Sequence, residues 1–129
     1  MSDKFTVEII TPDKSIFKSE TSEVTIPSYE GQMGILKDHI SLITFLRPGI
    51  IAIKDQDEKK FYVEEGTVEF SNNNLLILTS TGRSLNSLNK SSVESLLNKA
   101  ESKLKEENYS DKEKYLLSYK INTLKEINR

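Results

Sequence analysis

The sequence predicts an α+β protein, in which an N-terminal antiparallel β-sandwich is followed by a C-terminal antiparallel two-helix hairpin. Short apolar runs with period-two alternation, separated by turn residues, fill about the first 85 residues. From Leu88 onward the chain has no glycine or proline, and its apolar residues recur at helical spacing. We therefore predict a β-sandwich domain over residues 1–86 and a helical hairpin domain over residues 87–129.

The β-sandwich is predicted from a succession of short strands. Alternation begins at Phe5, and Thr11–Asp13 gives a turn because proline presets φ and Asp can accept bonds from nearby amides. A second alternating run is expected to end at Pro27, and further turns fall at Arg47–Gly49 and Asn72–Asn74. The apolar residues of the later runs are Ile40, Leu42, Phe45, Ile51, Ile53, Phe61, Val63, Val68 and Phe70. About eight to ten such strands favour a sandwich or flattened barrel.

The hairpin is predicted from two amphipathic segments. Ser91 and Glu94 have the spacing of a capping box for the first helix, with Asn89 as a competing cap, and Ser110 and Glu113 have it for the second. The apolar stripes are Val93, Leu96, Leu97, Ala100 and Leu104, then Leu116, Leu117, Tyr119, Ile121, Leu124 and Ile127. Because so short a hairpin is marginal alone, its apolar side needs a cover, either the sandwich or another protein.

The composition argues against several functional classes. With no cysteine, the chain has no disulfide, no thiolate nucleophile and no cysteine-based zinc site. Its net charge of −2 argues against nucleic-acid binding. No apolar run reaches the roughly 18 residues that span a bilayer, so we expect no direct membrane insertion. Residues 1–89 carry 9 Lys or Arg and 13 Asp or Glu, whereas residues 90–129 carry 9 and 7, which indicates two units with different partners.

One histidine and two glycines come nearest to a catalytic pattern. Asp38 and His39 are neighbours, but successive strand residues face opposite ways, and no nucleophile motif accompanies them. Gly31 and Gly34 lack the rest of a phosphate-loop motif, and we expect both to give backbone freedom in a tight loop. Met33 between them fits either core filling or a contact surface. We therefore predict no catalytic residue, no metal site and no cofactor.

The chain carries VTIPSYEGQMGILKDHISLITFLRPG, then FYVEEGTVEFSNNNLLILT, then the two-helix tail. This order resembles the epsilon subunit of bacterial rotary ATP synthase over essentially the whole chain. The residues that fit the family pattern are Gly31, Gly34, Ile35, Leu36, His39, Leu42, Leu46, Pro48, Gly49, Gly66, Glu69, Ile77 and Leu78. Ser41 stands where the family favours proline and Glu65 where it favours glycine, departures that alter turn stiffness more than fold.

The resemblance implies a docking role. In this family the sandwich sits on the foot of the rotating gamma subunit, and one of its loops touches the ring of c subunits. The residues implied to contact the c-ring are Glu30, Gly31, Gln32 and Met33, and those implied to lie towards gamma are His39 and Leu42. The implied function is that of a non-catalytic central-stalk subunit of proton-driven ATP synthase, peripheral on the cytoplasmic face of the bacterial inner membrane, which couples gamma to the c-ring. A free-standing β-sandwich adaptor for some other protein is the alternative.

The family's hairpin can also extend into the catalytic head and block ATP hydrolysis. The residues implied to meet acidic groups of the alpha and beta subunits are Lys112, Lys114, Lys120 and Lys125. Without the resemblance, lysines interleaved with acids are typical either of a solvated face or of a basic docking surface. Some relatives bind ATP through an Asp-x-x-Arg-Ala motif, where this chain has Asn89, Ser92 and Val93, so we expect weak or no ATP binding.

Overall fold

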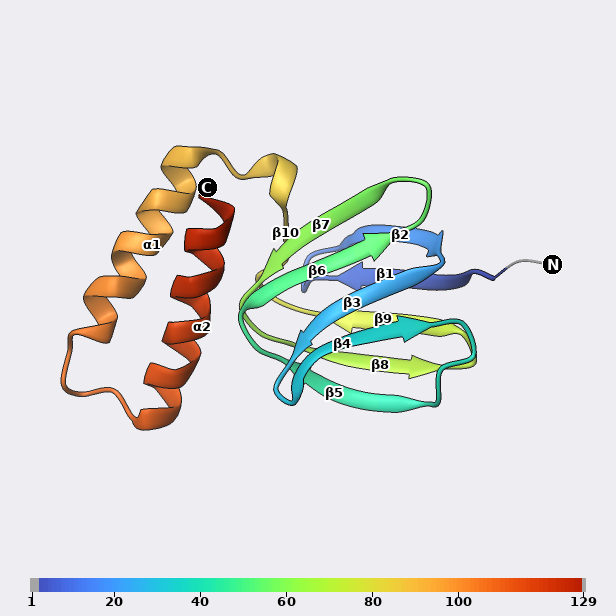
Figure 1. Cartoon of the computed structure of the whole chain (residues 1–129), viewed down its shortest axis with the longest axis horizontal. Helices are drawn as coiled ribbons and strands as arrows, with labels where there is room; N and C mark the ends of the chain where they lie inside the picture. Colours follow the sequence, from blue (N-terminus) through green and yellow to red (C-terminus); the bar gives the residue numbers. More distant parts are fainter. Residues whose placement is uncertain (1–2, 129) are drawn as a thin grey trace.

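The computed structural model describes residues 3–128 and confirms the predicted fold, a β-sandwich with a two-helix hairpin at one end (Figure 1). Met1, Ser2 and Arg129, which belong to the predicted domains, lie outside the described residues. The strands are β1 (Phe5–Ile10), β2 (Ser15–Thr21), β3 (Glu23–Ser28), β4 (Gly31–Leu36), β5 (Leu42–Leu46), β6 (Gly49–Lys54), β7 (Glu58–Val63), β8 (Gly66–Ser71), β9 (Asn74–Leu78) and β10 (Arg83–Ser84).

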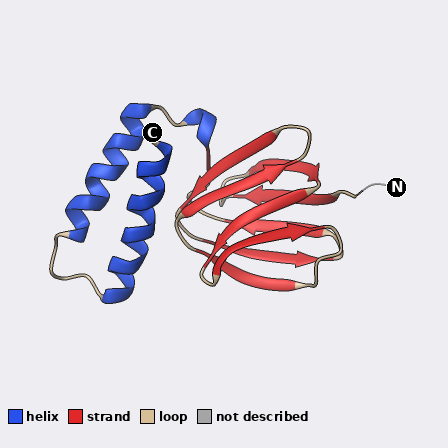
Figure 2. Ribbon diagram, in the orientation of Figure 1, coloured by secondary structure: helices blue, strands red, loops and turns tan. Residues whose placement is uncertain are grey.

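The strands form one hydrogen-bonded path that folds over on itself. Its order is β10-β7-β6-β3-β5-β8-β9-β1-β2, with β4 paired to the other side of β3. Every pairing is antiparallel except that of β1 with β9. The fold-over comes where β3 meets β5, because these two strands pair only at Ser28 and Leu46. Two layers therefore face each other across the core, as Figure 2 shows.

The core is built from the inward residues of both layers. Its buried members are Phe5, Val7, Ile9, Val24, Ile26, Ile35, Leu46, Ile51, Ile53, Phe61, Val63, Val68, Phe70, Leu75 and Ile77. The rings of Phe5 and Phe70 meet edge-to-face, with centroids 5.6 Å apart. The period-two alternation therefore assigned most strands to the correct face.

Two turns show how local chemistry sets the strand ends. Asn72 and Asn73 both have positive φ, of 51° and 58°, which suits the tight turn between β8 and β9. The strand expected to end at Pro27 instead continues to Ser28. Proline is tolerated there because β6 pairs with β3 only as far as Thr25, and the Pro27 carbonyl still accepts a bond from the Arg47 N–H at 3.0 Å.

The helices begin at the caps that the sequence offered, with one correction. Helix α1 (Lys90–Leu104) is capped by Asn89, whose side chain accepts from the Ser92 N–H at 2.7 Å. The predicted capping box at Ser91 is wrong, because Ser91 already lies inside the first turn. Helix α2 (Asp111–Ile127) begins with the predicted capping box. A short 3-10 helix, Leu85–Ser87, connects the last strand to the hairpin.

The sandwich covers the apolar side of the hairpin. Helix α2 lies between α1 and the strands (Figure 1). The buried centre of this contact is made by Tyr62 of β7, Val93 of α1 and Leu124 of α2. The partly buried residues packed around it are Leu85, Leu88, Leu96, Leu97 and Ile127. Of the two covers considered, the structure therefore uses the chain's own sandwich.

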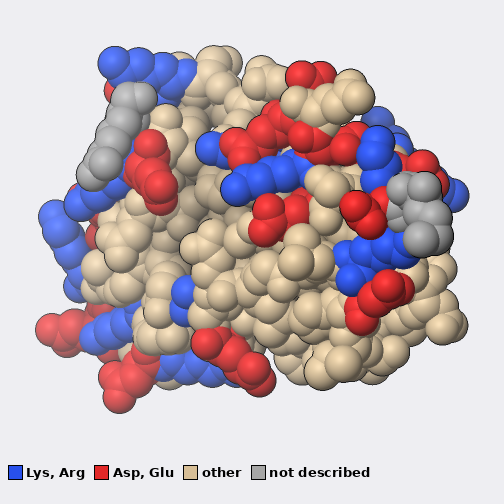
Figure 3. Space-filling model, turned by 45° about the vertical axis from the view of Figure 1, so that its right-hand side comes forward, with Lys and Arg blue, Asp and Glu red and all other residues tan. Residues whose placement is uncertain are grey.

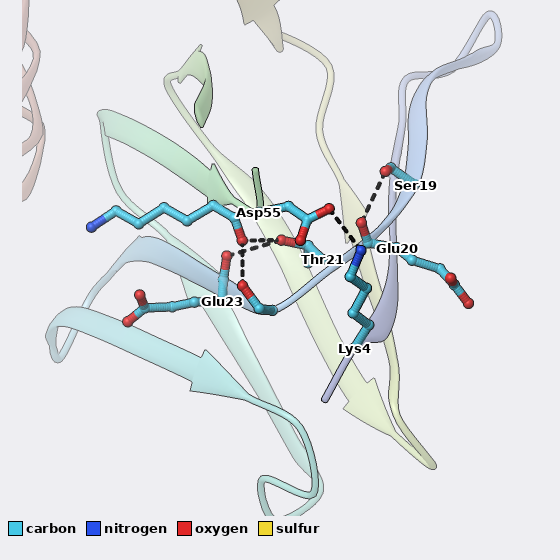
Figure 4. A network of polar contacts seen from close by, with 8 residues as sticks. Lys4, Ser19, Glu20, Thr21, Glu23 and Asp55 are labelled. Carbon is cyan, nitrogen blue, oxygen red and sulfur yellow. Dashed lines mark hydrogen bonds and ion pairs between the residues drawn. The ribbon is translucent and has the colours of Figure 1, made fainter. Parts of the chain in front are cut away.

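Polar bonds close the sandwich at the turn between β2 and β3 (Figure 4). The buried Thr21 hydroxyl donates to the Lys54 carbonyl at 2.6 Å, and the Ser22 hydroxyl donates to the same carbonyl at 2.9 Å. The Lys4 ammonium pairs with Asp55 at 3.1 Å. These contacts join the start of β1, the β2–β3 turn and the end of β6.

Candidate functional site

The tip of the β3–β4 hairpin carries the residues implied to meet the c-ring. Tyr29 and Glu30 form its two-residue turn, because Ser28 pairs with Gly31. The Ser28 hydroxyl donates to the Gly31 carbonyl at 2.6 Å and braces the turn. The side chains of Glu30 and Gln32 are exposed. The tip therefore presents a carboxylate and an amide to its surroundings.

The two glycines at this tip differ from each other, and one of them departs from the expectation. Gly31 has a φ of 124°, which a residue with a Cβ rarely adopts, so its glycine is required by the backbone. Gly34 has no positive φ, and the nearest atom to an added Cβ would be a Glu23 side-chain oxygen at 3.9 Å. The expectation that Gly34 supplies special backbone freedom is therefore wrong. Met33 packs partly against the core.

The residues nearest to a catalytic pattern are each engaged elsewhere. The Asp38 N–H donates to the Asn73 side chain at 2.7 Å, and the Asn73 amide donates back to the Asp38 carboxylate at 3.0 Å. The His39 Nδ1 lies 2.8 Å from the Ile40 carbonyl oxygen. The bonds between Asp38 and Asn73 fasten the loop before β5 to the β8–β9 turn. Among the described residues, no group of three or more acidic or histidine side chains is placed to hold a metal ion.

The segment that includes β5 exposes large apolar side chains. Leu36 is 55% exposed, Ile40 79%, Ile43 72% and Phe45 56%. Leu42, which the resemblance places towards gamma, packs instead against the core. We call Ile40, Ile43 and Phe45 the apolar face. Exposed apolar residues scattered singly are ordinary, whereas exposed apolar residues gathered on one segment are typical of an interaction surface.

The apolar character continues across the layer. By strand register Phe45 lies opposite Thr67, Thr67 opposite Leu78, and Leu78 opposite Ile10. Leu78 is itself 44% exposed. On the next row Ile43 lies opposite the exposed Glu69. The space-filling view shows a broad area without charged side chains on the sandwich (Figure 3). A partner docking here would meet an apolar row beside one carboxylate.

One polar contact holds the hairpin against β7. The Lys120 ammonium of α2 lies 3.0 Å from the Glu64 carboxylate, and both side chains are largely shielded from solvent. The Tyr62 hydroxyl donates to the same carboxylate oxygen at 2.9 Å. Burial, and then the Glu64 charge, raise the pKa of Tyr62 far above its usual range. Tyr62 is therefore a neutral donor at physiological pH.

A second contact holds the hairpin at the turn between β5 and β6. The Arg47 guanidinium lies 3.9 Å from the centre of the Tyr119 ring. The Tyr115 and Tyr119 hydroxyls are hydrogen-bonded at 3.1 Å, and this bond, followed by desolvation, raises the pKa of Tyr119. A cleft of about 550 Å³ remains between α2 and the strands, lined by Arg47, Lys60 and Tyr119 among others.

The other lysines implied to be regulatory lie away from these contacts. Lys112 and Lys125 are exposed, and Lys114 is half-buried in the first turns of α2. Lys120, by contrast, pairs with Glu64 of the sandwich. At the positions of the ATP motif, Asn89 caps α1 and Val93 is buried in the contact with the sandwich. Weak or absent ATP binding stays a prediction.

Comparison with known proteins gives the family. Residues 4–83 match the family model described as ATP synthase, Delta/Epsilon chain, beta-sandwich domain. The ATP synthase epsilon chain of Pelagibacter ubique (strain HTCC1062) is 47% identical over 130 residues, which cover 99% of this chain and 100% of that protein. The chain belongs to the epsilon-chain family of ATP synthase. A further family member, from Sulfurihydrogenibium sp. (strain YO3AOP1), is 30% identical over 85% of this chain and 84% of its own.

Solved structures support the fold of the family member described here. A chain of the Euglena gracilis mitochondrial ATP synthase, in a structure of OSCP/F1/c-ring, matches with a TM-score of 0.75 and 17% identity, over 97% of this chain and 79% of that one. A chain of the Tetrahymena thermophila mitochondrial ATP synthase, in a structure of central stalk/c-ring, matches with a TM-score of 0.64 and 15% identity, over 96% of each. At these identities the likeness establishes the fold. Within residues 3–128 no helix is long and apolar enough to cross a membrane.

Sequence reasoning missed three parts of this site. It did not separate Ile43 and Phe45 from Leu42, because β5 is apolar at four of its five positions and alternation then assigns no face. It also missed Glu64 and Arg47 as the sandwich partners of α2. One signal was available: an antiparallel strand with one solvated face usually alternates, so a strand that is apolar on both sides favours cover on both faces.

Proposed function

We propose that this chain is a non-catalytic rotor subunit in the central stalk of a proton-driven ATP synthase, where it fastens the gamma subunit to the c-ring. Membership of the epsilon-chain family supports this proposal. The two matching structures, one of an OSCP/F1/c-ring assembly and one of a central stalk/c-ring assembly, agree with it. The observation that carries it is the apolar face of Ile40, Ile43 and Phe45, which is exposed on a sandwich whose core is otherwise complete.

The segment from β3 to β5 offers one surface for each partner, the tip of the β3–β4 hairpin for the c-ring and the apolar face for gamma. The apolar face would dock on gamma, because burying exposed apolar area is the main favourable term in stable association. His39 and Leu42 would support it from the loop and from the core. Glu30, Gly31, Gln32 and Met33 would meet the polar loops of the c-ring, with Glu30 and Gln32 as the exposed side chains. The rigid sandwich between these contacts would transmit torque.

The subunit would perform no bond chemistry and would lie on the cytoplasmic face of the bacterial inner membrane, held there by its partners. Asp38 and His39 support this reading, because the Asp38 Oδ1 and the His39 Nδ1 are each engaged in a local bond. The catalytic alpha and beta subunits would carry out the reaction. Energy would reach them as rotation of the stalk.

The hairpin supplies the regulatory part of the proposal. In the structure it is docked on the sandwich through Leu124, Lys120 and Tyr119. We infer that this is the form that permits hydrolysis, and that a released hairpin inhibits hydrolysis in the catalytic head. Release would free the Lys120 ammonium from Glu64, so that it, with Lys112, Lys114 and Lys125, could meet acidic groups of the alpha and beta subunits.

Affinity capture tests the proposed function. The tagged chain, produced in its own cells, is purified from gently solubilised membranes, and the gamma and c subunits are quantified in the eluate. We expect both to co-purify with the wild type. Phe45→Glu should lose most of them, because it places a carboxylate in an apolar contact next to Glu69. Ser19→Glu adds the same charge on β2, at the other end of the layer, and should retain them.

The same capture distinguishes the adaptor alternative. If the wild type brings down neither gamma nor c subunits and yields a different protein instead, the rotor function is wrong. If Phe45→Glu and Ser19→Glu retain gamma equally, the apolar face is not the docking surface. Circular dichroism of each variant establishes that it is folded before capture is compared.

A further inference from the structure

Strand β5 has a free edge. It pairs along its whole length with β8, but on its other side it pairs with β3 only where Leu46 meets Ser28. On that side the Phe45 carbonyl accepts from the Tyr29 N–H at 3.1 Å, and the Arg47 N–H donates to the Pro27 carbonyl at 3.0 Å. Because backbone groups alternate along a strand, those of residue 43 point the same way.

The free backbone groups are the N–H and C=O of Ile43 and the N–H of Phe45. Within residues 3–128, no strand pairs with β5 beside them. An unpaired strand edge is a template for another strand, and proteins usually protect it with charged residues, proline or a bulge. The five residues of β5, Leu-Ile-Thr-Phe-Leu, contain no charge and no proline. This edge is therefore unprotected.

Two other edge strands, β2 and β4, differ from β5 in how well they could pair with a further strand. Strand β2 carries Lys18 and Glu20, and its end is tied to β6 by the polar bonds of Figure 4. Strand β4 contains Gly31 and Gly34, which weaken a strand as a pairing template. At β5 two exposed large apolar side chains, Ile43 and Phe45, flank the free backbone groups, whereas the exposed apolar side chain of β4, Leu36, lies at the end of its strand. The pattern suits strand pairing with a partner.

We propose that an extended segment of the gamma subunit adds to the sheet as a further strand along β5, hydrogen-bonding to the backbone of Ile43 and Phe45. This inference rests on the proposed function and specifies how the apolar face is used. Main-chain bonds would fix the register, and alternate apolar side chains of the added strand would pack beside Ile43 and Phe45. The sheet would then run from one subunit into the next, which suits a joint that must carry torque.

The charged residues near β5 indicate which residues the added strand of the partner should carry. The exposed Glu69 lies opposite Ile43 on β8, and the exposed Glu30 follows Tyr29, which bonds to Phe45. The added strand should therefore be apolar on the side that shares the apolar face, with Lys or Arg near its ends. A second copy of this chain would bring its own Glu30 and Glu69 to the joint and offers no such complement. Charge complementarity thus favours the heterologous strand.

Hydrogen exchange read by NMR tests the strand addition directly. In the isolated full chain the amides of Ile43 and Phe45 should exchange rapidly, because no strand covers them. In the complex with purified gamma subunit they should slow by at least a hundredfold. The amides of Leu42 and Thr44, which face β8, serve as internal references and should be protected in both states.

A pair of substitutions separates backbone bonding from side-chain packing. Ile43→Pro removes the edge N–H, fits an extended φ and leaves the β8 pairing in place, whereas Ile43→Ala keeps the N–H and removes most of the side chain. We expect Ile43→Pro to bind gamma at least tenfold more weakly than Ile43→Ala. Docking through side chains alone predicts the reverse order, because proline retains more apolar surface than alanine.

The outcomes distinguish this inference from the proposed function. If the wild type binds gamma but the Ile43 and Phe45 amides remain fast, strand addition is wrong and docking stands. If the wild type does not bind gamma at all, the proposed function fails as well. If these amides are protected in the chain alone, together with a dimeric mass, a second copy occupies the edge and the inference is overturned. The exchange measurement uses the unmodified chain, so it decides even if Ile43→Pro does not fold.

Discussion

At the scale of single residues, small polar side chains join neighbouring strands by hydrogen bonds on one side of the sandwich, and large apolar side chains are exposed on another. Thr21 and Ser22 both donate to the Lys54 carbonyl and so close one side of the molecule. Ile43 and Phe45 leave the other side exposed. Gly31 adds a third kind of constraint, because its backbone conformation, and not its size, excludes other residues at the tip of the β3–β4 hairpin.

Paired substitutions of the two hairpin glycines test that constraint. Gly31→Ala should destabilise the chain by about 1–3 kcal/mol, because its φ of 124° is strained for a residue with a Cβ. Gly34→Ala should change the free energy of unfolding by less than about 0.5 kcal/mol, because it meets ordinary space in a backbone open to any residue. Urea unfolding followed by circular dichroism measures both. Equal losses for the two variants would contradict the backbone argument.

At the scale of elements, the docked hairpin depends for its order on its contacts with the sandwich. Two helices of 15 and 17 residues would be marginal alone, so their order depends on the cover that β7 and the β5–β6 turn provide. Leu124 supplies the apolar contact, while Glu64 and Arg47 fix how α2 sits on the sandwich. An element held by a few such contacts can be released without unfolding the sandwich.

Two lysines of α2 provide a matched test of this docking. Lys120→Met should weaken the docked state by about 1 kcal/mol, because it removes the charged partner of a largely shielded Glu64. Lys125→Met removes the same charge from an exposed site and should have little effect. Amide exchange of α1 and α2 measures hairpin opening, and it should rise about fivefold in Lys120→Met alone. Identical exchange in both variants would show that the ion pair does not hold the hairpin.

At the scale of the whole molecule, alternation and helical spacing sufficed for the α+β fold and for most of the core. The capping box at Ser110 followed from local spacing, but the choice of Asn89 over Ser91 depended on where the chain leaves the 3-10 helix. The ion pair of Lys120 with Glu64 joins distant parts of the chain, so no local pattern predicts it. The face of β5 was undetermined for a different reason, since its residues are apolar on both sides.

The proposed interface is an exposed strand and not a pocket. The core is already packed, and the outer side of β5 exposes further large apolar side chains, a feature typical of surfaces that a partner covers. Family membership supplies the setting, the ATP synthase complex. The structure supplies the surface that we propose meets the stalk.

Cross-linking to gamma tests this central claim most directly. The chain has no cysteine, so Ile43→Cys introduces a unique thiol on the apolar face, and Ser19→Cys introduces one on β2 as the control. With a short thiol-directed photo-cross-linker in native membranes, we expect Ile43→Cys to give a product containing the gamma subunit in high yield and Ser19→Cys to give little. A yield from Ile43→Cys no greater than that from Ser19→Cys would contradict the account.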